Sequence, residues 1–297
     1  MLRTGLLFLF LTLLLGLSAQ TSNIVVVNDT NGFTGTISAI DHWGGISNVV
    51  KPGQKIGLLI NSDFSEPGAY VNPDLSIAVV KMCFEAGASE VISLQDIKPE
   101  YWQRSANFEA NKSIIGRVRM VDKNTFPATY DSINFTRLDT IPGAKALRKA
   151  EVVSELFKID VFIDIPVAKH HATTILTCCM KNLMGVCTRA TNVTMHLNGP
   201  KRNDPVYLAQ CITDIFVIRK PDLYIVDALM GIVTNGPNGP GEIVKSGKII
   251  IGTDPVALDS YCAKLLGFPQ SDVPTLQTGE ASGLGTANLE NVTIREF

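Results

Sequence analysis

The alternation of apolar strand-like runs with helix-like runs constrains the fold of this chain most. Residues 55–61 read as a buried strand, residues 75–86 as a helix that starts after Asn72-Pro73-Asp74, and residues 91–94 as the next strand. A strand, a helix and a strand in this order form a right-handed βαβ unit with parallel strands. The second half repeats the pattern, with strands predicted at 161–165, 223–226, 248–251 and 292–296 and helices at 204–219 and 254–266. The sequence therefore predicts an α/β fold, in which a mainly parallel sheet is flanked by helices in α/β/α-type layers.

The segment between the two halves is less regular. Residues 98–150 are more polar than their surroundings, with a strand predicted at 133–138 and a short helix following at 152–157. We expect a single domain over residues 21–297, and any division into two lobes would fall near residues 98–150.

The N-terminus departs from this globular pattern. Met1-Leu2-Arg3 carries one positive charge, Leu6 to Leu17 is an uncharged apolar run, and Ser18-Ala19-Gln20 follows it. This is the layout of a secretory signal peptide over residues 1–20, and the apolar run is too short for a comfortable membrane span. We therefore expect a periplasmic or extracellular protein without a stable membrane anchor after cleavage. The alternative is an uncleaved N-terminal anchor.

Composition narrows the classes of partner. The chain has 297 residues, a formal net charge of −2 and no block rich in Lys and Arg, so a nucleic-acid partner is not expected. The sequence has no Gly-x-Ser-x-Gly elbow, no His-Glu-x-x-His and no dinucleotide fingerprint after the first strand. Hydrolase and dehydrogenase functions therefore lack their usual signals.

The six cysteines limit the cofactors. None of their spacings is Cys-x-x-Cys, so we expect no iron–sulfur cluster and no zinc site made of cysteines alone. The adjacent pair Cys178-Cys179 is either two packed free thiols or a strained, redox-active disulfide, which an exported chain would permit.

The residues most suited to chemistry follow the strand at 161–165. Lys169, His170 and His171 come just after its end, where parallel sheets bind ligands. A helix that began near His170 would align His170, Thr174, Thr177 and Lys181 on one face. Its N-terminus and Lys169 could then hold an anion. The alternative is a half-exposed helix with ordinary surface groups.

Several short blocks, taken together, resemble a family known as domain of unknown function 362. They are Val50-Lys51-Pro52-Gly53, Pro166 with Lys169 and His171, Lys181-Asn182-Leu183-Met184-Gly185, Lys220-Pro221-Asp222-Leu223 with Asp227, and Gly252 to Asp259. This resemblance implies a shared fold and a site around the central block, but the family has no settled activity. Many relatives carry ferredoxin-like cysteine motifs, which are absent here. The family's first-strand lysine is also absent, because Leu59 and Ile60 precede Asn61. A more remote likeness is to the nickel-pincer-dependent lactate racemase, whose site also gathers histidines and a lysine.

These observations lead to a set of candidate site residues. Lys181, His171 and His196 are the candidates for proton transfer, because the histidines titrate near neutral pH and Lys181 lies in a block that resembles the family. The candidate ligand-binding residues are Lys169, His170, Asn182, Asp227 and Asn61, and the best candidates for a divalent metal are His171, His196 and Asp227.

We expect Lys169, His171, Lys181, His196 and Asp227 to line one cleft at the carboxyl ends of the strands. The alternative is a set of scattered surface groups. The predicted function is an exported enzyme that binds a small anionic substrate, with a divalent metal as an optional cofactor. The alternative is a non-catalytic binding protein for an anionic ligand or a metal. Asp254 reads as a helix cap, and Asp259 is either buried against a lysine or a ligand.

Overall fold

An eight-stranded sheet forms the centre of the protein. The computed structural model describes residues 22–121 and 130–297. The strand order is β14-β1-β13-β10-β7-β2-β3-β4, and β13 is antiparallel to both of its neighbours while the other neighbouring strands pair in parallel. These results confirm the mainly parallel sheet. The strands are β1 (Ser22–Asn28), β2 (Lys55–Ile60), β3 (Glu90–Ser93), β4 (Arg119–Met120), β7 (Val161–Ile165), β10 (Leu223–Ala228), β13 (Lys248–Gly252) and β14 (Val292–Glu296).

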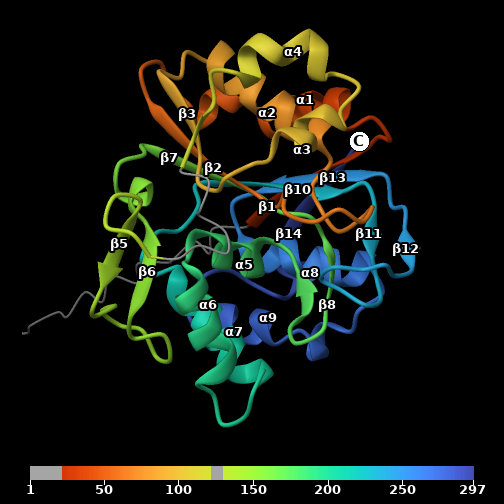
Figure 1. Cartoon of the computed structure of the whole chain (residues 1–297). Helices are drawn as coiled ribbons and strands as arrows, with labels where there is room; N and C mark the ends of the chain where they lie inside the picture. Colours follow the sequence, from red (N-terminus) through yellow and green to blue (C-terminus); the bar gives the residue numbers. More distant parts are fainter. Residues whose placement is uncertain (1–21, 122–129) are drawn as a thin grey trace, which may run out of the picture.

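Helices cover both faces of this sheet (Figure 1). Successive side chains of a strand point to opposite faces, so Ile24 and Val25 of β1 belong to two separate apolar cores. The α/β/α layering predicted from the sequence is thus confirmed. One face carries α1 (Gly32–Trp43), α2 (Pro73–Glu85), α3 (Pro99–Gln103) and α4 (Phe108–Ile115), and the other carries α5 (Cys179–Asn182), α6 (Arg189–Leu197), α7 (Pro205–Ile215), α8 (Pro255–Leu265) and α9 (Pro274–Ala281).

Two helices begin where the sequence places capping residues. The Asn72 side chain accepts a hydrogen bond from the backbone N–H of Asp74 at 2.9 Å, just before α2. Asp254 Oδ1 accepts from the N–H groups of Val256 and Ala257, both at 2.9 Å, at the start of α8. These caps satisfy N–H groups that have no partner within the helix. Asp254 is therefore a helix cap.

Two local predictions are wrong. The segment 152–157 is a strand end followed by a short 3-10 helix, because β6 (Ala150–Val153) pairs with β5 (Phe135–Leu138). No helix begins near His170, because β8 (Lys169–His171) and β9 (Ile175–Thr177) form an antiparallel hairpin. Its β-branched residues favour extended backbone over helix. The polar residues between 170 and 181 therefore do not form one helical stripe.

A further small two-stranded sheet is formed by β11 (Gly231–Ile232) and β12 (Ile243–Val244), which pair antiparallel.

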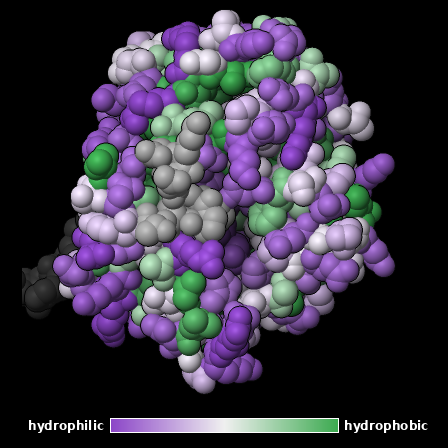
Figure 2. All heavy atoms as spheres, viewed as in Figure 1, coloured by the Kyte–Doolittle hydropathy of each residue, from purple (hydrophilic) through white to green (hydrophobic). Residues whose placement is uncertain are grey.

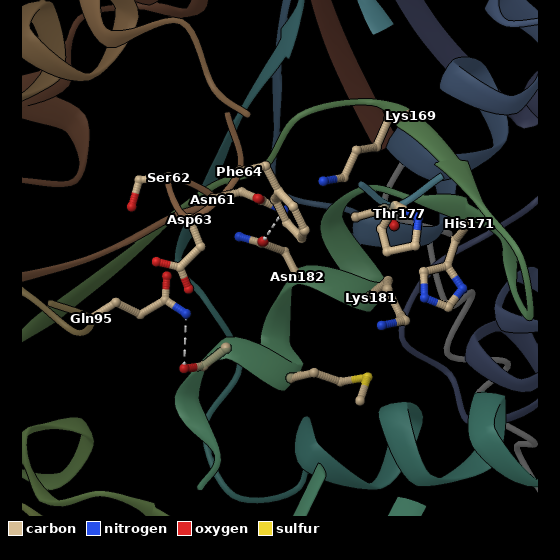
Figure 3. Close-up of a pocket in the computed structure, with 13 residues that line it drawn as sticks. Asn61, Ser62, Asp63, Phe64, Gln95, Lys169, His171, Thr177, Lys181 and Asn182 are labelled. Carbon is tan, nitrogen blue, oxygen red and sulfur yellow. Dashed lines mark hydrogen bonds between the residues drawn. The ribbon is translucent and has the colours of Figure 1, made fainter. Parts of the chain in front are cut away.

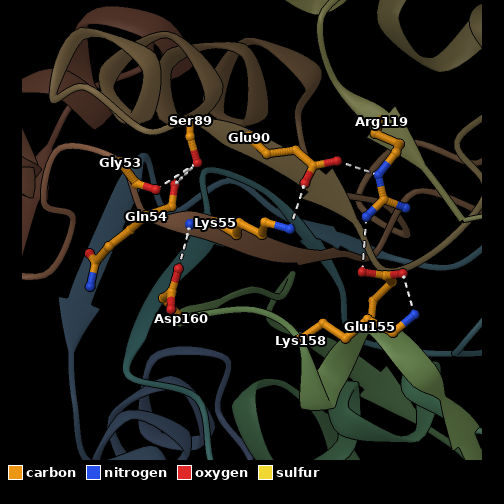
Figure 4. Close-up of polar contacts among 9 residues, drawn as sticks. All are labelled: Gly53, Gln54, Lys55, Ser89, Glu90, Arg119, Glu155, Lys158 and Asp160. Atoms are coloured by element: carbon orange, nitrogen blue, oxygen red, sulfur yellow. Dashed lines mark hydrogen bonds and ion pairs between the residues drawn. The ribbon is translucent and has the colours of Figure 1, made fainter.

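Ion pairs join the layers at the amino-terminal edge of the sheet (Figure 4). Arg119 of β4 contacts Glu155 at 2.9 Å and also binds Glu90 of β3. Lys55 of β2 lies 3.8 Å from the other oxygen of Glu90, and Lys158 lies 3.2 Å from Glu155. Each cation in this cluster thus has a carboxylate partner.

The surface mixes residue types. On the face shown in Figure 2, hydrophilic side chains surround small apolar patches. Within the described ranges, no helix is long and apolar enough to cross a membrane. The signal peptide predicted at residues 1–20 lies outside these ranges.

Candidate functional site

A small pocket lies at the carboxyl ends of β2, β3 and β7. Its volume is about 90 Å³, which accommodates a few water molecules or one small anion. Figure 3 shows Asp63 and Gln95 on one side of it and Lys169, His171 and Lys181 on the other. The lining residues are Asn61, Ser62, Asp63, Phe64, Gln95, Lys169, His171, Thr177, Lys181, Asn182, Met184, Gly185 and Pro237.

Lys169 is buried although it carries an amine. Its side chain is 0% exposed, Nζ donates a hydrogen bond to the carbonyl of Ala69, and Nζ lies 3.6 Å from the centre of the Phe64 ring. Burial, with the charge of Lys181, lowers the pKa of Lys169 from its usual 10.5 to about 6, although Asp63 opposes the change. At neutral pH most Lys169 amines are therefore unprotonated.

Lys181 and Asn182 enter the pocket from α5. Burial lowers the pKa of Lys181 to about 8. The Asn182 amide donates to Asp164 Oδ1 at 2.6 Å and accepts from the amide of Asn61 at 3.2 Å. Asn61 and Asn182 therefore connect the end of β2 to α5, and the predicted ligand-binding residue Asn182 is already engaged with Asp164.

The hydrogen bonds of His171 assign its tautomer. Its Nδ1 accepts from the backbone N–H groups of Thr173 at 3.1 Å and Thr174 at 3.2 Å, in the turn of the hairpin. Burial and the charge of Lys181 keep the pKa of His171 far below its usual value, so the ring is neutral. The proton then resides on Nε2, which can donate to a ligand but is not free to bind a metal.

The other two histidines of this region lie outside the pocket lining. The ring centre of His196, in α6, is 6.5 Å from that of His171, and its Nδ1 lies 3.0 Å from Asn203 Oδ1. If Nδ1 donates to Asn203, Nε2 of His196 is free to accept a proton. His170 Nδ1 accepts from the N–H of Gly236 at 2.9 Å. A Cβ at Gly236 would lie 1.9 Å from the His170 carbonyl oxygen, so this close approach requires glycine.

Asp227 does not line the pocket. Its carboxylate accepts from the N–H groups of Asn72 at 2.6 Å and Leu229 at 2.9 Å, which joins β10 to the start of α2. Burial raises the pKa of Asp227 to about 6. The structure thus brings Lys169, His171 and Lys181 together without Asp227. In the described part of the chain, His171, His196 and Asp227 do not form a group whose ligand atoms could share one ion.

Asp63 is a pocket residue that sequence reasoning missed. It follows β2 by three residues, and burial raises its pKa from 3.8 to about 6, against the opposing charge of Lys98. The signal was present in the sequence, because a carboxylate lies just beyond the strand end, two residues after Asn61.

Beside the pocket-lining Thr177, the chain places two thiols and a carboxylate close together. The ligand atoms of Cys178, Cys179 and Asp259 all lie within 4.8 Å of one another, and all three residues are buried. Both cysteines are free thiols, so the disulfide considered from the sequence is not formed. Asp259 is buried at this cluster, and its Oδ2 accepts from the N–H of Met180 at 3.2 Å. These three residues could hold a metal ion.

This chain is similar to several known proteins. The thylakoid-associated protein sll1697 of Synechocystis is 25% identical over 262 residues, which cover 84% of this chain and 75% of that protein. The lactate racemase apoprotein of Thermoanaerobacterium thermosaccharolyticum has a TM-score of 0.50 and 11% identity, over 81% of this chain. A crystal structure of a Thermotoga maritima protein has a TM-score of 0.47 and 13% identity, over 80% of this chain. The chain spans 56% and 58% of these two solved chains, respectively.

The sequence profile of the family described as domain of unknown function (DUF362) matches residues 55–264. This range holds most of the sheet, the hairpin and every residue that lines the pocket. The chain therefore belongs to the DUF362 family.

Proposed function

We propose that this protein is an enzyme that binds a small carboxylate in the pocket and moves a proton on it. The observation that carries the proposal is the meeting of three nitrogen groups, from Lys169, Lys181 and His171, in a cavity of about 90 Å³. Within the described residues, neither lysine forms an ion pair. Lys181, whose pKa is about 8, is mainly a cation at neutral pH, and a bound anion would supply its partner.

The opposite edge of the sheet provides an internal comparison. There, Lys55, Lys158 and Arg119 each have a carboxylate partner (Figure 4). At the pocket, the ligand itself would be the partner. The Nε2–H of His171 and the Nζ of Lys181 supply the donors, because the amide of Asn182 is already bound to Asp164.

Two groups in the pocket are suited to proton transfer. Burial brings the pKa of both Lys169 and Asp63 to about 6. Groups that titrate near the working pH are the most effective general acids and bases. An anion next to Lys169 would raise its pKa, so ligand binding would protonate part of this amine and make it a general acid.

The first probes are small 2-hydroxycarboxylates and 2-oxocarboxylates. Their size suits the cavity, and the fold is shared with a protein whose name is lactate racemase. Titration calorimetry with lactate and pyruvate tests binding, and proton NMR in deuterated buffer tests exchange at the carbon next to the carboxylate. Lys181→Met should abolish binding, whereas Lys55→Met is a control at the opposite edge that should not. If no small carboxylate binds at millimolar concentration, the proposal is wrong.

A non-catalytic binding protein is the second candidate. The fixed position of Lys169, held by Ala69 and Phe64, favours tight capture of one anion over turnover. Binding of lactate or phosphate without any exchange or product would support this second function.

We also propose that the protein is exported, on the basis of the charged start and apolar run of residues 1–20. Intact-mass measurement on protein from its native host tests this point. A cytoplasmic protein that still begins at Met1 or Leu2 would contradict it.

A further inference from the structure

Sulfur and carboxylate groups meet in the core between α5 and α8. Cys178 directly precedes α5, Cys179 is its first residue, and Asp259 lies in α8. All three are at most 1% exposed. The two Sγ atoms are 3.8 Å apart, and the ligand atoms of all three residues lie within 4.8 Å of one another.

The spacing of the two sulfurs fits a tetrahedral metal. Zinc–thiolate bonds of about 2.3 Å at tetrahedral angles separate two sulfurs by about 3.8 Å. The sulfurs of Cys178 and Cys179 already have this separation, whereas a disulfide would need about 2 Å. The thiols would therefore need little movement to bind an ion.

Buried oxygens at the same place are available to bind a cation. Among the described residues, none donates a hydrogen bond to the buried oxygens Asp259 Oδ1 and Asp164 Oδ2. Tyr224, whose hydroxyl also lacks a partner, is paired with Asp164 across β7 and β10. Buried polar atoms in native proteins nearly always have a partner, and exceptions often mark an ion or a water. A cation bound to Asp259 would satisfy its free oxygen.

We propose that Cys178, Cys179 and Asp259 bind a zinc ion that fastens α5 to α8. Thiolates select zinc over magnesium or calcium, and a carboxylate is an accepted third ligand. Two thiolates and one carboxylate around Zn²⁺ leave one net negative charge, and binding of the ion would release the protons that these buried groups carry without it. Cys262 lies one turn after Asp259 in α8, and its thiol neighbours Cys178, so it is placed to complete the four-coordinate shell.

The position of the ion gives it a structural role. Helix α5 has four residues, and so short a helix is unstable without tertiary support. It carries Lys181 and Asn182 into the pocket (Figure 3). A zinc ion at its first residue would hold both side chains in place. This inference is independent of whether the pocket binds an anion.

Metal analysis of the full chain, purified under reducing conditions without chelators, tests the inference. We expect one zinc ion per chain, and after exchange for cobalt we expect thiolate-to-cobalt charge-transfer absorption with the visible bands of tetrahedral Co²⁺. Cys178→Ala and Asp259→Asn should each lose the metal. Cys83→Ala is the matched control, because Cys83 is equally buried but lies in α2 on the other face of the sheet.

The metal content of wild-type protein also tests zinc binding, even if a variant fails to fold. Wild-type chains that contain no zinc, and that show no thiolate–cobalt band when cobalt is added, would overturn the inference. In that case the cluster consists of neutral thiols and a protonated Asp259. Full zinc content in folded Cys178→Ala protein would overturn it as well.

Discussion

The amide of Asn182 donates a hydrogen bond to the buried carboxyl of Asp164 over 2.6 Å. Because this bond supplies a partner to a carboxyl that is 0% exposed, Asn182→Ala should destabilise the fold by about 1–3 kcal/mol. Urea unfolding measures the change. Asn198→Ala, at an exposed position, is the control and should change stability by less than about 0.5 kcal/mol. Equal effects of the two substitutions would contradict the role assigned to this bond.

Replacing Lys169 should make stability less dependent on pH. The folded-state pKa of about 6 lies below the usual 10.5, so the folded protein binds fewer protons than the unfolded chain between these values. The penalty for the buried amine is therefore complete below about pH 6 and declines as pH rises toward 10. It amounts to several kcal/mol, because each tenfold change in proton affinity is worth about 1.4 kcal/mol.

Lys169→Met should thus gain stability over wild type, most at about pH 6 and least near pH 10, as measured by urea unfolding across that range. Asp63, whose pKa is raised, acts in a separate window: its contribution to stability falls as pH rises from about 4 to 6. Lys55→Met, which removes an exposed lysine, should show no such trend. A difference in unfolding free energy between Lys169→Met and wild type that does not change with pH would contradict the prediction.

Anion binding should be accompanied by proton uptake. At pH 7.5 most Lys169 amines are neutral, and a bound anion raises the pKa of Lys169, so part of a proton is taken from the buffer. Calorimetry with lactate in two buffers of different ionisation enthalpy measures this uptake. In Lys169→Met the dependence of the binding heat on the buffer should fall to the smaller part that comes from Lys181, whose pKa is about 8. An undiminished dependence in the variant would exclude Lys169 as the main group that is protonated.

His171→Asn should weaken binding by about tenfold, which corresponds to the loss of one hydrogen bond of about 1.4 kcal/mol. Asparagine retains an acceptor for the turn N–H groups of Thr173 and Thr174 but lacks the Nε2–H. Calorimetry measures affinity, and a melting curve checks the fold. His42→Asn is the control, because His42 stacks on Phe297 and does not line the pocket. Unchanged affinity in His171→Asn would remove His171 from the ligand site.

The parts of the fold that could be predicted are those fixed by local chemistry. The starts of two helices could be predicted from the capping residues in Asn72-Pro73 and Asp254-Pro255. The strand at 161–165 could be predicted from its run of apolar residues. The hairpin that follows could not be predicted, because a short apolar run suits either a helix or a strand. The hairpin is set by the pairing of Lys169 with Thr177 across the two strands and by the hydrogen bond that His171 Nδ1 accepts from Thr173 in the turn.

The site was only partly accessible to sequence reasoning for the same reason. Lys169 and His171 could be placed because they follow a strand directly. Asp227 also follows that pattern, yet its carboxylate binds the backbone of Asn72, a contact between residues 155 positions apart. The approach of Asp259 to Cys178 likewise depends on packing between helices distant in sequence. The ends of strands predict where a site lies, whereas contacts between residues distant in sequence determine which side chains belong to it.

The pairing of β1 has a consequence for folding during synthesis. Within the described sheet, this strand pairs only with β13 and β14, which are synthesised after the other strands of the sheet. A growing chain therefore holds an apolar strand with both hydrogen-bonding edges open for most of its synthesis, and such edges invite pairing with other chains. The eight-stranded sheet can be completed only after β14 has left the ribosome.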